Sequence, residues 1–304
     1  MANLNLSIII LSYNTKDITD ECLSRLRLSV LSCQKKLANQ IETLVIDNAS
    51  DDGSAEMVKK NHPWVKLIES KENTGYSKGN NIGISQSKFP LILLLNSDVY
   101  LEEDTLEKAL DYFNNPDCDV LGPQMVFENG QFQPSAGNLP TPFNTISWIL
   151  GLSLIPGVGS LTNPFHPNYK DFFEKERKVG WITGAFFMFK REIYEKINGL
   201  DENIFMYLEE VEFCKRITMA GFKIWYVPAI KIIHLHGASS NFDSSVALLG
   251  ELTGLKYYFQ KYYSQNYPLV KFFLILGLIL RVIAFSFFGK TKKARVYIQG
   301  LGVI

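Results

Sequence analysis

Polar side chains follow three apolar segments of this chain, where buried strands are expected to end. The three clusters are Ser12-Tyr13-Asn14 after Leu6–Leu11, Asp47-Asn48 after Ile41–Ile46, and Asn96-Ser97-Asp98 after Pro90–Leu95. Ligands of parallel α/β sheets bind beyond the carboxyl ends of the strands. The three clusters therefore predict one binding crevice. Asp47 is placed to accept hydrogen bonds from a base or ribose, and a cap on the next helix is the alternative role.

Asp98 follows a strand in which every side chain after the proline is apolar. A divalent cation that bridges two phosphates needs hard oxygen ligands of this kind, usually few, with water and phosphate completing its shell. Capping of a helix that begins near Glu102 is the alternative role for Asp98.

Two further clusters of titratable residues lie in the second half of the chain. Glu209, Glu210 and Glu212 fall within one helical turn between apolar residues. Like charges this close raise each other's pKa, which suits a general base near neutrality, although acids also favour a solvated helix start. His234 and His236 end an apolar strand, and alternate strand residues point the same way. The pair can therefore face one pocket or play a structural part.

The elements that position these residues alternate between strand and helix. Strands are expected at 6–11, 41–46, 65–69 and 90–95, with helices at 17–36, up to 60, and from Gly75. This rhythm predicts an α/β fold with a mostly parallel sheet. A hairpin is expected around Glu128-Asn129-Gly130, loops over 134–178, a strand at 184–190, a helix at 207–220 and strands over 223–236. Glycines at 75, 79 and 83 share one helical face, which indicates close packing or backbone approach to a ligand.

The charge of the chain is zero in total but unevenly distributed. Of 31 basic and 31 acidic residues, eight basic and no acidic ones lie between Leu252 and Ile304, so this tail carries +8 and the rest −8. Four cysteines without metal-ligand spacing indicate reduced thiols in a cytosolic setting. The apolar run Leu6–Leu11 is too short for a secretory signal. No basic-aromatic motif for nucleic acid appears in the acidic body.

These motifs, in this order, resemble the family-two inverting glycosyltransferases of GT-A fold, and within them the bacterial rhamnosyltransferase-like group. The resemblance covers residues 5–240 and rests on a series of short motifs. They are SIIILSYN from Ser7, VIDNASDDG from Val45, EN-x-GY-x3-N-x2-G from Glu72, LNSD from Leu95, W-x2-GA from Trp181, EEVE from Glu209 and H-x-HG from His234.

The resemblance implies a role for each matching position. Glu210 would be the general base, and Asp98 would bind a divalent cation, Mg²⁺ or Mn²⁺, with His234 or, less favoured, His236. The nucleotide-sugar-binding residues would be Ser12, Tyr13, Asn14, Asp47, Asn48, Gly75, Asn80, Asn96 and Asp98, with Asp47 on the base. The acceptor and donor-sugar side would be Trp181, Gly184, Ala185 and Glu209. Two positions depart from the family pattern, since Asn96 replaces the first acid of the DxD motif and Glu210 stands where Asp is common.

The domain organisation follows from the resemblance and from the charge. Residues 1–245 are expected to form the GT-A domain, with a nucleotide-binding half at 1–115 and an acceptor and catalytic half at 116–245. Residues 246–304 are expected to form a helical, aromatic-rich tail on an anionic membrane surface. Pro268–Phe288 is about 31 Å long as a helix, enough to span a bilayer. Basic residues at both of its ends favour an in-plane or re-entrant helix, and a single span, a buried core helix or an oligomer interface are the alternatives.

The predicted function is transfer of a sugar from a nucleotide-diphosphate donor to a hydroxyl of a lipid-linked or cell-surface polysaccharide. The favoured sugar is L-rhamnose, with dTDP-rhamnose as its donor. This activity serves polysaccharide biosynthesis for the cell envelope at the cytoplasmic face of the membrane. UDP- and GDP-sugars remain alternative donors. A sugar-phosphate nucleotidyltransferase is disfavoured, because Ser12-Tyr13-Asn14-Thr15 replaces the glycine-rich basic loop expected after its first strand. A catalytically silent membrane scaffold is disfavoured because the acidic clusters are present.

Overall fold

The computed structural model describes residues 4–37, 40–152, 155, 162–167, 169–235 and 244–304. The chain divides into two compact units, the first formed by residues 1–136 and 170–242 and the second by residues 137–169 and 243–304. The segment 137–169, expected to form loops in the acceptor half, thus belongs to the same unit as the C-terminal helices.

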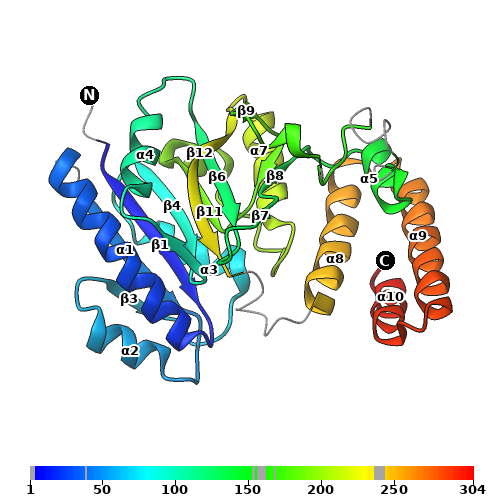
Figure 1. Cartoon of the computed structure of the whole chain (residues 1–304), viewed down its shortest axis with the longest axis horizontal. Helices are drawn as coiled ribbons and strands as arrows, with labels where there is room; N and C mark the ends of the chain where they lie inside the picture. Colours follow the sequence, from blue (N-terminus) through cyan, green and yellow to red (C-terminus); the bar gives the residue numbers. More distant parts are fainter. Residues whose placement is uncertain (1–3, 38–39, 153–154, 156–161, 168, 236–243) are drawn as a thin grey trace. The chain divides into compact units, whose positions relative to one another are not determined.

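A mixed ten-stranded sheet forms the centre of the first unit (Figure 1). Four neighbouring strands run parallel: β3 (Lys66–Glu69), β2 (Ile41–Asp47), β1 (Leu6–Ser12) and β4 (Leu91–Asn96). Ser12 pairs in register with Asp47, and Leu11 with Asn96, so the predicted polar clusters share one edge of the sheet. The predicted α/β class is confirmed for this unit.

The remaining strands extend the sheet with mixed directions. They are β5 (Val99–Leu101), β6 (Val120–Val126), β7 (Phe132–Gln133), β9 (Arg177–Lys178), β11 (Phe186–Lys190) and β12 (Ile224–His234). β11 runs antiparallel between β4 and β6, while β12 runs parallel to β6 and antiparallel to β5. β7 pairs antiparallel with β6, which confirms the predicted hairpin. The short strands β8 (Ala136–Gly137) and β10 (Trp181–Ile182) lie outside this sheet.

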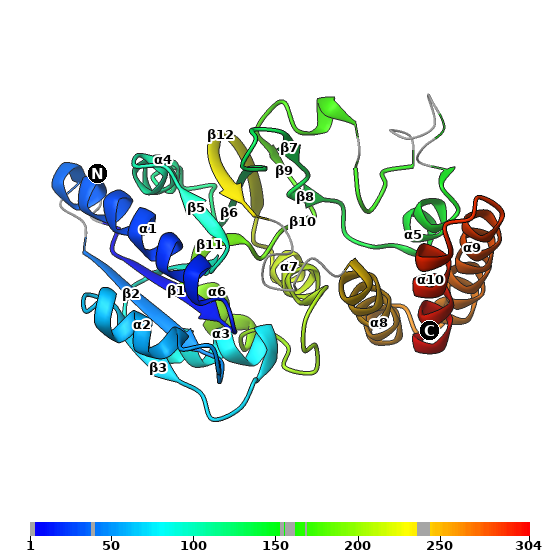
Figure 2. The ribbon, with the colours of Figure 1, turned by 60° about the horizontal axis from the view of Figure 1, so that its bottom comes forward.

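Helices cover both faces of the sheet (Figures 1 and 2). One set is α1 (Lys16–Leu37), α2 (Ser54–Asn61) and α4 (Thr105–Tyr112), and the other is α3 (Gly75–Ser85), α6 (Arg191–Ile197) and α7 (Glu209–Met219). Ile8 and Ile10 of β1 join the core under α1 and α4. Ile9 faces α3, where a Cβ added at Gly83 would lie 2.5 Å from its Cγ2. Successive side chains of β1 point to opposite faces of the sheet, and both faces are covered by helices. This explains why the apolar run at 6–11 is unbroken.

The second unit is helical. It contains α5 (Pro142–Ile149), α8 (Ser244–Tyr262), α9 (Tyr267–Phe287) and α10 (Thr291–Val303). Close contacts at two glycines hold it together: a Cβ at Gly277 of α9 would lie 2.6 Å from Ile149 of α5, and one at Gly300 of α10 would lie 2.9 Å from Leu252 of α8. Within the part of the chain described, α9 is the one helix whose length and composition suit a membrane span, with a mean hydropathy of 2.3.

Candidate active site

Asp47 and Asn48 form the centre of the first part of the site, after β2. Asp47 Oδ2 accepts a hydrogen bond from the Ser50 amide at 3.1 Å, while its buried Oδ1 has no hydrogen-bond partner. Asn48 Oδ1 accepts bonds from both the amide and the hydroxyl of Thr74, each at 2.9 Å, and Asn48 Nδ2 donates to Asn73. Asp47 does not cap α2, because Asp52 accepts the bond from the Ser54 amide. One oxygen of the Asp47 carboxylate is thus held by the main chain, and the other is available to accept a hydrogen bond from a ligand.

The residues after β1 build the neighbouring loop. Ser12 Oγ lies within hydrogen-bond distance of Thr15 and Thr19 hydroxyls, inside the protein. Asn14 has a left-handed φ of 51° and is tied to the loop after β2, its amide donating to Ser50 Oγ and its Oδ1 accepting from the Asp51 amide. Tyr13 is exposed beside it. The tether explains why a non-glycine residue holds this conformation.

Asp98 lies in the turn between β4 and β5 and meets His234 at the end of β12, which pairs with β5. The Asp98 carboxylate is buried, and its Oδ1 lies 3.5 Å from His234 Nε2 and has no hydrogen-bond partner. The main chains are also joined, since the Leu235 amide donates to the Asp98 carbonyl at 3.0 Å. Asp98 is not the cap of α4, which begins after Asp104. Within the described residues no group of three or more His, Cys, Asp or Glu side chains forms a metal site. His236 lies outside the described residues.

The three glutamates of α7 have different surroundings. Glu209 is buried and its Oε2 has no hydrogen-bond partner, and burial together with the neighbouring Glu210 carboxylate raises its pKa well above the usual value. Glu210 is partly exposed. Glu212 is fully buried, and Arg216 neutralises it through bonds of 2.8 to 3.0 Å. The acidic cluster of the sequence therefore separates into a pair, Glu209 and Glu210, and a structural ion pair.

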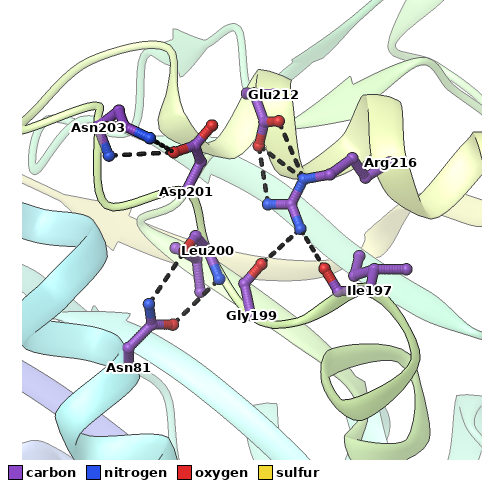
Figure 3. A network of polar contacts seen from close by, with 8 residues as sticks. All are labelled: Asn81, Ile197, Gly199, Leu200, Asp201, Asn203, Glu212 and Arg216. Carbon is purple, nitrogen blue, oxygen red and sulfur yellow. Dashed lines mark hydrogen bonds and ion pairs between the residues drawn. The ribbon is translucent and has the colours of Figure 1, made fainter.

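Arg216 also ties α7 to the loop that precedes it (Figure 3). Its Nη1 donates to the carbonyls of Ile197 and Gly199, each at 2.6 Å. Asn81 of α3 holds the same loop through two 3.0 Å bonds to the Leu200 main chain (Figure 3). The loop ends in two consecutive left-handed residues, Tyr207 and Leu208, with φ of 69° and 71°. Helix α7 thus starts at Glu209 rather than at the predicted Tyr207.

Tyr76 connects the two sides of the site. Its hydroxyl donates to the Gly184 carbonyl at 2.8 Å, and its amide donates to the Phe205 carbonyl at 2.7 Å. Burial and then the Glu209 and Glu210 carboxylates raise the pKa of the Tyr76 hydroxyl well above its usual value, so it stays protonated. A Cβ at Gly75 would lie 2.5 Å from the Phe205 carbonyl oxygen, which accounts for the glycine there.

The other residues expected in the site have the following places. Ala185 accepts a bond from the Asn96 amide at 3.0 Å through its carbonyl, and joins the sugar side to the end of β4. Trp181 is buried in β10. Asn80 donates to the Tyr76 carbonyl inside α3 at 3.0 Å, so its amide supports the helix. The glycines at 79 and 83 pack on Leu11 and Ile9 of β1.

Three residues that organise this site were not predicted from the sequence: Asn73, Tyr76 and Gln133. Asn73 and Tyr76 belong to the family motif that begins at Glu72, but a motif does not specify the hydrogen bonds that its residues make. Gln133 is buried on β7 and bonds to His234, which is 101 positions away in the sequence. Nothing in a single sequence connects two residues so far apart.

The model of glycosyl transferase family 2 matches residues 7–198, a stretch that includes β1 from Ser7, both Asp47 and Asp98, and the Tyr76–Gly184 contact. The chain belongs to glycosyl transferase family 2. The resemblance predicted from the sequence is thereby confirmed, and this protein is a glycosyltransferase.

Two relatives of this glycosyltransferase show its closer similarities. The N-acetylglucosaminyl-diphospho-decaprenol L-rhamnosyltransferase of Mycobacterium tuberculosis is 27% identical over 217 residues, which cover 67% of this chain and 69% of the relative. The rhamnosyltransferase WbbL of Escherichia coli K12 is 27% identical over 172 residues, 53% of this chain and 60% of the relative.

Among solved structures, the mannosyltransferase PcManGT from Pyrobaculum calidifontis, solved with GDP-Man and Mn²⁺, superposes with a TM-score of 0.58. The superposition covers 97% of this chain and 85% of that one at 15% identity. The similarity confirms the predicted GT-A fold of this family 2 enzyme.

Proposed function

We propose that this glycosyltransferase moves L-rhamnose from dTDP-rhamnose to a hydroxyl of a lipid-linked saccharide, with inversion at the anomeric carbon. One observation carries the proposal: Asp47, Asp98 and Glu209 each bury a carboxyl oxygen that has no hydrogen-bond partner. Buried polar atoms are nearly always paired, so an unpaired oxygen on each of three residues of the predicted site supports completion of these groups by a ligand. The names of the mycobacterial and E. coli relatives support rhamnose as the sugar.

Asp47 supports a base that presents a hydrogen-bond donor on its pairing edge. Its Oδ1 is a pure acceptor when ionised, and the Ser50 amide occupies only Oδ2. The N3–H group of thymine or uracil is such a donor, and so is the N1–H group of guanine. The choice of dTDP over UDP and GDP therefore rests on the names of the relatives, and UDP- and GDP-sugars remain the alternatives to dTDP-rhamnose.

Glu210 is the proposed general base, at the first turn of α7. It takes the proton of the acceptor hydroxyl as that oxygen forms its bond to the anomeric carbon and the bond from that carbon to the diphosphate breaks. Glu209 beside it has a raised pKa, so it is held in the neutral acid form more readily than an exposed glutamate. A neutral Glu209 avoids charge repulsion and leaves the negative charge on Glu210, where the proton is received.

The proposed divalent cation would be held by Asp98 and His234. The fit is favourable, because a buried carboxylate oxygen without a hydrogen-bond partner and an imidazole nitrogen lie 3.5 Å apart. Mg²⁺ and Mn²⁺ at such sites take one or two protein ligands and complete their shell with phosphate and water, so two ligands suffice. The cation would supply charge stabilisation to the departing nucleoside diphosphate. The Pyrobaculum mannosyltransferase was solved with Mn²⁺, which supports this choice.

The domain assignment extends the proposal to the whole chain. We assign the nucleotide to residues 1–115 and the acceptor and catalytic groups to 116–245, and we place the tail at 246–304 on an anionic membrane at the cytoplasmic face. The mycobacterial relative is named for a decaprenol-linked acceptor, which supports a membrane-bound acceptor class here.

The exposed side of α9 supports an in-plane arrangement. Val270, Leu274, Gly277 and Leu278 form the buried side. The other side exposes large apolar side chains, namely Leu269, Phe272, Ile279, Leu280, Ile283 and Phe287. Arg281, which would be costly at the centre of a span, donates to the carbonyls of Ile149 and Gly277 within the unit. Helix α9 therefore packs through one side and exposes an apolar surface on the other. Lys290, Lys292 and Lys293 follow it in the chain. This combination suits the interface of an anionic bilayer.

Donor binding and transfer test the proposed reaction. The full chain is titrated calorimetrically with dTDP, UDP, GDP and CDP in the presence of Mn²⁺, and transfer from dTDP-rhamnose to a polyprenyl-diphosphate saccharide is followed by chromatography. We expect dTDP to bind the unmodified chain. Asp47→Asn should weaken this binding, because one of the two acceptor oxygens of the carboxylate becomes an NH₂ donor, which cannot accept the N3–H hydrogen bond of the base. Exposed Asp51→Asn is the matched control. Preferential binding of CDP, or an unchanged affinity in Asp47→Asn, would refute the base assignment.

Vesicle binding tests the membrane surface. The full chain should sediment with vesicles of phosphatidylcholine and phosphatidylglycerol, and be released by alkaline carbonate, as a peripheral protein is. Phe272→Ser/Ile283→Ser should lose this binding, whereas the exposed pair Leu28→Ser/Leu31→Ser on α1 should keep it. Retention in carbonate-washed membranes would instead support a span.

A further inference from the structure

Gln133 makes an unusual two-point contact with His234. It is a buried residue of β7, and its side-chain Nε2 donates to the His234 carbonyl at 2.8 Å. Its side-chain Oε1 lies 3.0 Å from Nδ1 of the same histidine. One amide therefore holds both the main chain and the ring of a residue 101 positions later.

The two contacts together place a proton on Nδ1 of the imidazole. The donor to a carbonyl must be the amide NH₂ group, so the atom facing Nδ1 is the amide oxygen, which only accepts. Nδ1 must then carry a hydrogen. In the neutral ring this leaves Nε2 without a proton.

The unprotonated nitrogen faces Asp98. His234 Nε2 and Asp98 Oδ1 are 3.5 Å apart, and Asp98 is buried with no hydrogen-bond partner at that oxygen. Neutral Nε2 and an ionised carboxylate oxygen are both electron-pair donors, so they do not bond to each other. Two such atoms at this separation are matched by a positive charge that both can ligate.

The main chain keeps this geometry in register. His234 pairs with Val99 across β12 and β5, and the Leu235 amide bonds to the Asp98 carbonyl. Gln133 is placed from the third side, because β7 pairs with β6 at Met125. Rotation of the imidazole about its side-chain bonds would break the contact with Gln133 Oε1.

We propose that Gln133 is a positioning residue for the cation site: it selects the Nδ1–H tautomer of His234 and aims Nε2 at the position shared with Asp98. This inference rests on the proposed function, which assigns a cation to Asp98 and His234. Groups that hold a metal-binding histidine in this way change metal affinity by about 10- to 100-fold when they are lost. Gln133 itself touches neither substrate nor cation.

The test separates this role from a merely structural one with two variants. Gln133→Leu removes both contacts, whereas Gln133→Glu keeps an acceptor for Nδ1–H and loses the donor to the His234 carbonyl. Exposed Gln131→Leu, in the same hairpin, is the matched control. A purely structural role would make Leu and Glu equally harmful to folding and leave cation affinity unchanged in whichever variant folds.

Two readouts are measured on the full chain. Long-range proton–nitrogen NMR reports the tautomer of His234, whose signal is assigned by its absence in His234→Asn. Mn²⁺ titration followed by electron paramagnetic resonance reports the affinity for Mn²⁺ in the presence of dTDP. We expect the Nδ1–H tautomer in the unmodified chain. We expect Mn²⁺ to bind about 10- to 100-fold more weakly to Gln133→Leu and within a few-fold of normal to Gln133→Glu and Gln131→Leu.

The outcomes distinguish this inference from the proposal on which it rests. An Nε2–H tautomer in the unmodified chain, or a folded Gln133→Leu variant with normal Mn²⁺ affinity, would overturn the role of Gln133 alone. An unmodified chain with the Nδ1–H tautomer that binds no Mn²⁺ would overturn the cation assignment, and the role of Gln133 with it.

Discussion

Replacement of Arg216 by methionine should destabilise the first unit more than any exposed charge removal. The guanidinium makes bonds of 2.8 to 3.0 Å to Glu212 and of 2.6 Å to the carbonyls of Ile197 and Gly199 (Figure 3). Glu212 is fully buried, so Arg216→Met takes the guanidinium away from a carboxylate that is out of contact with water.

The expected cost follows from that burial. Breaking a buried ion pair by removal of one partner costs about 3–5 kcal/mol, because the remaining charge stays out of water. Single domains are stable by about 5–15 kcal/mol, so Arg216→Met should lose a large fraction of the total. Activity should fall as well, since Arg216 holds the loop that leads into Glu209 and Glu210.

Urea denaturation followed by tryptophan fluorescence measures the loss. The matched control is Lys108→Met, which breaks an exposed i,i+4 pair with Asp104 and should cost less than about 1 kcal/mol. The double change Glu212→Met/Arg216→Met should be less harmful than Arg216→Met, because it removes the isolated charge. An Arg216→Met loss as small as that of the control, or a double variant less stable than the single one, would refute the reasoning.

Three further predictions concern the site itself. Glu210→Gln should lower the turnover of rhamnosyl transfer about 10²- to 10⁴-fold while the calorimetric affinity for dTDP stays unchanged, and normal turnover would exclude Glu210 as the base. Glu209 holds its proton to higher pH in the native than in the unfolded state, so its contribution to stability is complete below the usual pKa of 4.5 and is lost as the pH rises toward the native pKa. In urea titrations at rising pH above about 4.5, the stability of Glu209→Gln should therefore fall less than that of the unmodified chain, and parallel pH profiles would contradict this. Gly184→Ala places a Cβ 2.6 Å from Tyr76 Oη, and Tyr76 can move away only by losing its bond to the Gly184 carbonyl, so the change should cost about 1–3 kcal/mol. Adding Tyr76→Phe should recover part of that cost, whereas additive losses would show that the hydroxyl is not the obstacle.

Patterns local in the sequence were enough for the fold class and for one edge of the site. The unbroken apolar run of β1 and the turn cluster after Asp47 report burial and chain reversal directly, because both depend on neighbouring residues. Parallel strands then bring Asp47 and the end of β4 to the same edge without further information. The order of short motifs added the family, which no single motif would have specified.

Tertiary packing decided what each acidic residue and each distant segment does. Glu209 and Glu212 look alike in sequence, yet only Glu212 has an arginine placed to neutralise it. Segment 137–169 joins the C-terminal helices because Ile149 fits against Gly277, a contact between positions 128 apart. Gln133 and His234 meet only because β7 and β12 both flank β6. Such contacts depend on burial and on the closure of long loops, and neither leaves a periodic signal in the chain.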